Sequence, residues 1–156
     1  MVSNMIDQKT YSLIRELVPR VVVDLVILDP ENRVLLGKRT NDPMKGSWFY
    51  PGGAIVKNEL IDETIYRKLF EETGIKTIIS KAFLGTQEWF LGEYHDIALT
   101  FIVVVDKTKV TPNTEHLELL WFDILPDLDP RVEHWINVAR VDSSLRGKPV
   151  NRWKRC

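Results

Sequence analysis

The sequence predicts an α/β fold in which helices pack against a mixed β-sheet. Two apolar runs flank the turn signal Asp29–Asn32, a pattern typical of a pair of strands. The residues from about Glu59 to Thr73 have the spacing of an amphipathic helix. Segments rich in β-forming residues follow in the second half of the chain. With 156 residues, the chain can form one domain with its own core and without disulfides.

The amino-acid composition gives no indication that the protein binds nucleic acid or membranes. The chain has 21 Lys and Arg against 22 Asp and Glu, a balance that gives no sign of a dedicated nucleic-acid or membrane-surface protein. Its one cysteine, Cys156, allows no disulfide framework and favours a reducing compartment. The first residues lack the apolar core of a signal peptide, and no run reaches the roughly 20 apolar residues of a membrane span. We therefore expect a cytoplasmic protein that binds neither nucleic acid nor membranes.

The first expected element is a short helix from Asp7 to Val18. Tyr11 and Ile14 fall with Val18 at helical spacing, Asp7 suits the N-cap, and Pro19 ends the pattern. We expect this helix to pack on the main body of the protein or on a partner subunit.

A pair of strands and the amphipathic helix come next. The strands lie between Val21 and Thr40, and Asp24 interrupts the first apolar run. The helix ends at Gly74, because glycine adopts the left-handed stop conformation most readily.

Three more strands and a helix complete the expected fold. The strands are Thr77–Thr86, Asp96–Val105 and Leu117–Phe122. The helix spans Asp129–Arg140, and a basic tail follows it. The apolar side of this helix carries Val132, Trp135, Ile136 and Val138.

A carboxylate lies in the middle of the apolar side of the helix Glu59–Thr73. At 100° per residue, Glu72 shares this side with Ile61, Ile65, Lys68, Leu69 and Ile75. An unpaired charge on a buried face is costly, so such groups are normally paired, protonated or bound to a metal. Glu71 and Glu72 together could offer the hard oxygen ligands that Mg²⁺ prefers.

A second ridge of the same helix carries Glu59, Glu63, Arg67 and Glu71. Spacing of this kind is also common in the ion pairs of a solvated helix face. Just upstream, Gly52 and Gly53 allow the backbone to approach a ligand or metal closely, although a simple tight turn explains the pair equally well.

The spacing of these residues over positions 53–75 resembles the signature of the Nudix hydrolases. Gly53 is followed after five residues by Glu59 and after seven more by Arg67, and then come Leu69, Glu71, Glu72, Gly74 and Ile75. The resemblance implies an α/β/α sandwich on a mixed sheet and a single domain spanning residues 1–156. It also implies cleavage of a nucleoside diphosphate linked to another group. The box glutamates would hold Mg²⁺ or Mn²⁺, and Arg67 would keep them in place.

Lys68 departs from the usual box, which has a glutamate at this position that binds metal or acts as the base in attack on phosphorus. A protonated lysine has three donors and no lone pair, so it can do neither. The GDP-mannose mannosyl hydrolases, a branch of the family that attacks the anomeric carbon of the sugar, also lack this glutamate. The stretches "GKRTNDPMKGSWFYPGG" and "TEHLELLWF" resemble that branch.

The resemblance to that branch implies roles for particular residues. Metal would be held by the Gly53 carbonyl, Glu72 and Glu115, with Glu71 as a further ligand. His116 would be the general base, because histidine titrates near neutral pH. Arg39 would face the diphosphate, and Asp24 would be an active-site aspartate. Aromatic side chains would stack on the nucleobase of the substrate. The candidates are Trp48, Tyr50, Trp89 and Phe90, and each is equally plausible as a core residue.

Three functions remain open. The chain departs from the branch at Ala54, where an arginine is expected, at Trp89, where a histidine is expected, and at the retained Glu71. The first function is hydrolysis of a nucleotide sugar of the GDP-mannose or GDP-glucose type at carbon. The second is attack on phosphorus of ADP-ribose or a nucleoside triphosphate. The third is a catalytically weak nucleotide-binding module. The resemblance also implies a homodimer formed through the N-terminal helix.

Overall fold

The computed structural model describes residues 6–106, 110–111 and 116–141. Its three helices within these ranges are α1 (Gln8–Leu17), α2 (Ile61–Thr73) and α3 (Pro130–Val141). The strands are β1 (Arg20–Leu28), β2 (Val34–Arg39), β3 (Trp48–Phe49), β4 (Gly52–Ala54), β5 (Ser80–Leu91), β6 (Tyr94–Val104) and β7 (His116–Phe122).

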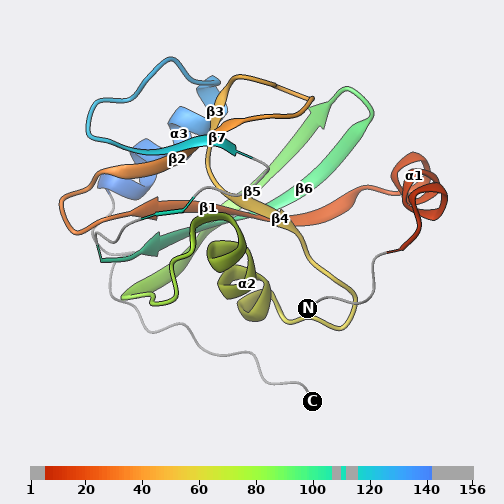
Figure 1. The fold of residues 1–156 in the computed structure, drawn as a ribbon, viewed down its shortest axis with the longest axis horizontal. Coiled ribbons are helices and arrows are strands. Elements are labelled where there is room, and N and C mark those ends of the chain that lie inside the picture. The colour runs from red at the N-terminus through yellow and green to blue at the C-terminus, as the bar shows by residue number, and fades with distance from the viewer. Residues whose placement is uncertain (1–5, 107–109, 112–115, 142–156) are drawn as a thin grey trace.

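The described strands form one mixed sheet with β1 near its centre (Figure 1). β1 pairs along its whole length with β6 in parallel, and β6 pairs with β5 as an antiparallel hairpin. On its other side β1 has two antiparallel partners, β4 at its N-terminal half and β2 at its C-terminal end. β2 in turn pairs with β3 and β7.

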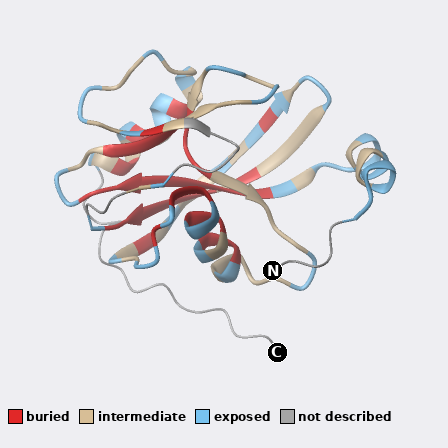
Figure 2. Cartoon of the chain, in the orientation of Figure 1, coloured by how far each residue is buried: buried red, intermediate tan, exposed pale blue. Residues whose placement is uncertain are grey.

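Alternation along β1 gives the sheet two buried faces. Val23, Leu25 and Ile27 pack with the apolar side of α2, whereas Val22 and Val26 pack with α3 on the opposite face. Figure 2 shows these strands as the most buried part of the molecule, with the inner side of α2 buried against them. The expected α/β fold with helices on both faces of a mixed sheet is therefore confirmed.

α1 stands away from the sheet at one end of the molecule (Figure 1). As expected, Asp7 caps it by accepting a hydrogen bond from the Thr10 N–H at 3.0 Å. One side of the helix is held to the body, because Arg20 donates to the Tyr11 hydroxyl at 2.6 Å. The other side leaves Leu13 and Leu17 exposed.

The bounds of α2 and β5 differ from the sequence-based expectation. α2 begins at Ile61 instead of Glu59, because the Glu59 carboxylate bonds back to the Val56 N–H at 3.0 Å and Leu60 has extended backbone angles. β5 begins at Ser80 and continues to Leu91, five residues beyond the expected end, where a two-residue turn joins it to β6.

No helix among the described residues is long and apolar enough to cross a membrane.

Candidate active site

A cavity of about 400 Å³ lies where β4 and the first half of β1 meet α2 and the turn end of the β5–β6 hairpin. This volume is within the usual range of small-molecule sites. Five of the residues expected to be functional line it, and they come from separate elements: Asp24 (β1), Arg39 (β2), Gly53 (β4), Glu72 (α2) and Trp89 (β5).

Gly52 lies between the two buried carboxylates of the cavity. Its N–H donates to Glu72 Oε2 at 3.3 Å, and a Cβ at this position would come 3.2 Å from Asp24 Oδ1 and 2.2 Å from the Val23 carbonyl oxygen. Only glycine therefore allows β4 to pair so closely with β1. The close pairing brings acids from opposite faces of the sheet to one cavity.

Asp24 is almost fully buried, with 5% of its surface exposed. Its Oδ2 accepts a hydrogen bond from the Trp89 indole N–H at 3.0 Å. Burial is the main cause that raises the pKa of Asp24 to about 7; the carboxylates of Asp96 and Glu72 add to its effect, and the hydrogen bond from Trp89 opposes it. Asp24 is thus a carboxyl group that changes charge close to neutral pH.

Arg67 connects Glu59 and Glu71 of the box. Its guanidinium donates to both oxygens of Glu59 at 2.6 and 2.8 Å, and to the Ala54 carbonyl at 3.1 Å. It also donates to Glu71 at 3.2 Å. Although burial opposes the shift, hydrogen bonds from Arg67, Thr64 and the Val56 N–H lower the pKa of Glu59 to about 2. The ridge is therefore a network that links α2 to β4.

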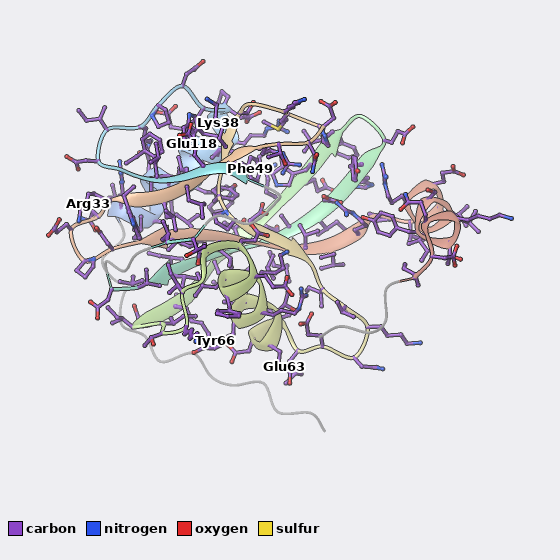
Figure 3. The ribbon with its side chains drawn as sticks, viewed as in Figure 1. Arg33, Lys38, Phe49, Glu63, Tyr66 and Glu118 are labelled. Atoms are coloured by element: carbon purple, nitrogen blue, oxygen red, sulfur yellow. The ribbon has the colours of Figure 1, made fainter. Side chains whose placement is uncertain are left out.

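Lys68 and Glu72 form the ion pair at the base of the cavity. Glu72 is 1% exposed, and Lys68 Nζ lies 2.9 Å from its Oε1. The same ammonium lies 3.4 Å from Oε2 of the more exposed Glu71. By contrast, Glu63 lies on the outer side of α2, away from the sheet (Figure 3). The carboxylate on the apolar side of α2 is thus paired with an ammonium group.

Arg39 lines the cavity at the end of β2, next to the start of β7. Arg39 donates from Nε to the Pro43 carbonyl at 2.9 Å. In the pairing of β2 with β7, the register partner of Arg39 is His116. The structure describes the backbone of His116 and not its side chain, and Glu115 lies outside the described residues.

The four aromatic candidates have different environments. Tyr50 and Trp89 line the cavity, and each is 2% exposed. Phe90 is 66% exposed and stacks on His95, outside the cavity. Trp48 packs against Phe122. The Trp89 ring is covered by Phe49, labelled in Figure 3, and by Arg131, so this indole presents its N–H edge to Asp24 and no open face to a base.

A second group of cavity residues was not anticipated from the sequence. Arg20 makes a bidentate pair with Asp96 at 2.8 and 2.6 Å. The Tyr94 ring lies under the guanidinium of Arg15 at 3.6 Å and near that of Arg20 at 4.9 Å. The sequence signal that could have located Tyr94 is Gly92, which takes a positive φ of 61° in the tight turn between β5 and β6.

The residues around Glu72 are of the type that binds Mg²⁺. Glu71 and Glu72 offer carboxylate oxygens and Gly53 offers a carbonyl, which are the hard donors that this ion prefers. Within the part of the chain that the structure describes, no three His, Cys, Asp or Glu converge to hold a metal. The donor types thus suit a divalent ion, although the described groups do not converge on one and Lys68 is paired with Glu72.

The substitution Asp24→Asn tests the burial of this carboxyl group. With a pKa of about 7 in place of 3.8, folded Asp24 keeps a proton that the unfolded chain loses above about pH 4. The wild-type protein should therefore lose stability as the pH rises from about 4 to about 7. The variant should lack this loss and become more stable than wild type by up to about 4 kcal/mol. Urea unfolding across this range measures the difference, and a difference that does not change with pH would contradict the assignment.

Comparison with known proteins identifies the family of the chain. The family model of the NUDIX domain matches residues 18–139. The glycan biosynthesis protein Agl8 of Haloferax volcanii is 38% identical over 129 residues, which cover 77% of this chain and 81% of that protein. An ADP-ribose pyrophosphatase of Methanocaldococcus jannaschii is 34% identical over 126 residues, covering 78% of this chain and 72% of that protein.

Solved structures share the architecture. A MutT protein from Methanosarcina mazei Go1 superposes with a TM-score of 0.68 at 25% identity, covering 78% of this chain and 93% of the other. The NUDIX domain of Shewanella oneidensis NrtR, solved with ADP ribose, superposes with a TM-score of 0.69 at 22% identity and covers 89% and 94%. The second likeness shows the fold alone. Because the domain model matches most of the chain and the Haloferax relative is 38% identical to it, the chain belongs to the Nudix hydrolase family.

Proposed function

We propose that this protein hydrolyses a nucleotide sugar of the GDP-mannose or GDP-glucose type at the anomeric carbon, giving the nucleoside diphosphate and the free sugar. The observation that carries the proposal is the ammonium of Lys68, 2.9 Å from Glu72 Oε1 at the base of the cavity. It stands where the usual box has the glutamate that serves attack on phosphorus. Because a protonated lysine accepts no proton, the base has to come from outside the box.

His116 is the proposed base. Its pairing with Arg39 across β2 and β7 supports this role, because Arg39 itself lines the cavity. A histidine accepts a proton from water near neutral pH, and water then attacks the anomeric carbon as the bond to the diphosphate oxygen breaks. Arg39 pairs with the diphosphate as its charge develops.

Glu72, the Gly53 carbonyl and Glu115 are the proposed holders of Mg²⁺ or Mn²⁺, with Glu71 beside them. The ion, when bound, neutralises charge on the leaving diphosphate. Arg67 fixes Glu59 and Glu71, and this network supports the metal-holding end of α2.

Asp24 and Trp89 are proposed to act together in binding the substrate. The Trp89 N–H fixes the orientation of the Asp24 carboxyl group, which then contacts a sugar hydroxyl in the cavity. Trp89 thus contributes through Asp24 and the cavity wall, since its ring faces are covered.

The relatives support a sugar-linked or ribose-linked substrate. The Haloferax relative is described as a glycan biosynthesis protein, which suits a nucleotide sugar. The Methanocaldococcus relative is described as an ADP-ribose pyrophosphatase, and its similarity favours a second candidate function, attack on phosphorus. In that reaction the carboxylate of Glu71 or Glu115 would act as the base in place of the missing glutamate. The retained Arg67 network argues against a mere binding module, which has no need of a metal-holding cluster.

We also propose that the protein is a cytoplasmic homodimer. The single cysteine, Cys156, supports a reducing compartment. Leu13 and Leu17 on the outer side of α1 are 52% and 70% exposed, and a second copy of the chain would cover them.

Hydrolysis of GDP-mannose in oxygen-18 water separates the two reactions. Attack at carbon places the label in the sugar, whereas attack at phosphorus places it in the phosphate. In the same assay His116→Gln should lower turnover by about a hundredfold or more, because the base is lost. His134→Gln, which removes an exposed histidine on α3, is the control and should leave turnover unchanged. If the label appears in the phosphate, attack at carbon is wrong and attack on phosphorus becomes the better account.

The substitution Glu72→Gln tests the metal assignment. Losing this charged ligand should weaken Mg²⁺ binding and lower turnover by about a hundredfold or more. Glu63→Gln changes a glutamate of the same helix that is exposed and lies outside the cavity, so it should behave as wild type. Circular dichroism checks that both variants fold. A folded Glu72→Gln protein with normal turnover would rule out this ligand.

Light scattering at micromolar concentration tests the dimer. The wild-type protein should have the mass of two chains, and Leu17→Glu should give the mass of one because it places a charge in the apolar contact. Ile124→Glu, which alters an exposed apolar residue outside α1, should leave the dimer intact. A wild-type protein that is monomeric under these conditions would refute the proposal.

A further inference from the structure

The buried pair of Lys68 and Glu72 has a consequence for how this site accepts metal. Glu72 is 1% exposed and lies within the cluster of residues that α2 buries against the sheet. A carboxylate in such a place needs a compensating charge, and here an ammonium 2.9 Å away supplies it.

The position of Lys68 on α2 and its packing against β4 hold the ammonium beside Glu72. Lys68 lies one turn before Glu72 on the same side of α2, and its side chain is 10% exposed. Its methylenes run against β4 at Gly53, where a Cβ would come 2.5 Å from Lys68 Cε. Glycine at this position therefore makes room for the lysine side chain.

We propose that Lys68 is a tethered cation that takes the structural place of a metal ion at Glu72 and must be displaced when a divalent ion binds. The proposal rests on the assignment of Glu72 as a metal ligand. An ammonium and a divalent ion at one carboxylate repel each other, and water screens this repulsion poorly at a buried site. Metal binding is then an exchange of one cation for another, and its affinity is lower than the oxygen donors alone would give.

Glu71 provides the alternative partner that the exchange requires. Its Oε2 already lies 3.4 Å from Lys68 Nζ, and its side chain is 42% exposed. A small movement of the lysine side chain transfers the ammonium from the buried carboxylate to the exposed one. Lys68 itself lines the cavity.

The test is Mn²⁺ binding to the purified full chain without substrate, measured by electron paramagnetic resonance, together with the melting temperature. Lys68→Met keeps most of the side-chain volume and removes the charge. It should bind Mn²⁺ at least about tenfold more tightly than wild type. Its metal-free melting temperature should fall by roughly 5 °C or more, because Glu72 loses its partner. Saturating Mn²⁺ should raise the melting temperature of this variant back to that of the wild type.

Lys81→Met is the matched control. Lys81 is also buried and also pairs with a carboxylate of α2, Asp62, but neither residue lines the cavity. This variant should melt at a lower temperature, with an unchanged affinity for Mn²⁺ and no recovery when Mn²⁺ is added.

Lys68→Gln provides a second measurement, since it removes the charge and keeps a hydrogen-bond donor. Tighter Mn²⁺ binding by either folded Lys68 variant supports the proposal, and so does folding of both only in the presence of Mn²⁺. Unchanged or weaker binding overturns it, as does failure of both variants to fold at saturating Mn²⁺. Because no substrate is present, these results do not depend on which substrate the enzyme hydrolyses, and a failed turnover assay would leave them unaffected.

Discussion

The close pairing of β4 with β1 is the constraint on which the candidate site depends. Gly52 fits against the Val23 carbonyl only because it lacks a side chain, and its N–H bonds to Glu72. This contact brings α2 and β1 together at one point of the sheet. Asp24 from one face and Glu72 from the other then open onto the same cavity. A larger residue at Gly52 would separate the two acids and remove the site.

Charge compensation follows from this crowding. Glu72 is paired with Lys68, Glu59 with Arg67, and Asp24 has a neutral donor, Trp89, with a pKa raised by burial. The Lys68–Glu72 pair lies within α2, the Arg67–Glu59 pair ties α2 to the segment that precedes it, and the neutral contact connects β1 to β5. Asp24, Glu72 and Asp96 of the cavity thus each have a partner, which is Trp89, Lys68 and Arg20 respectively.

The N-terminal helix and the cavity are parts of one network. Arg20 at the start of β1 bonds both Asp96 on β6 and Tyr11 on α1. Asp96 in turn raises the pKa of Asp24 through its charge, after the larger effect of burial. A second subunit packed on the exposed side of α1 would therefore contact the helix whose inner side borders the cavity. This arrangement gives a physical route between assembly and the site.

The sequence by itself determined the order of the elements, the box and the unusual position of Glu72, because these depend on residues near one another in the chain. Helical periodicity was sufficient to place Lys68 and Glu72 on one side of α2. The tertiary structure alone decided that Arg20 meets Asp96, since the two residues are 76 positions apart and the parallel register of β1 and β6 has no local signal. It also decided that Trp89 holds Asp24 instead of offering a stacking face, because burial of a ring is set by what other elements pack over it.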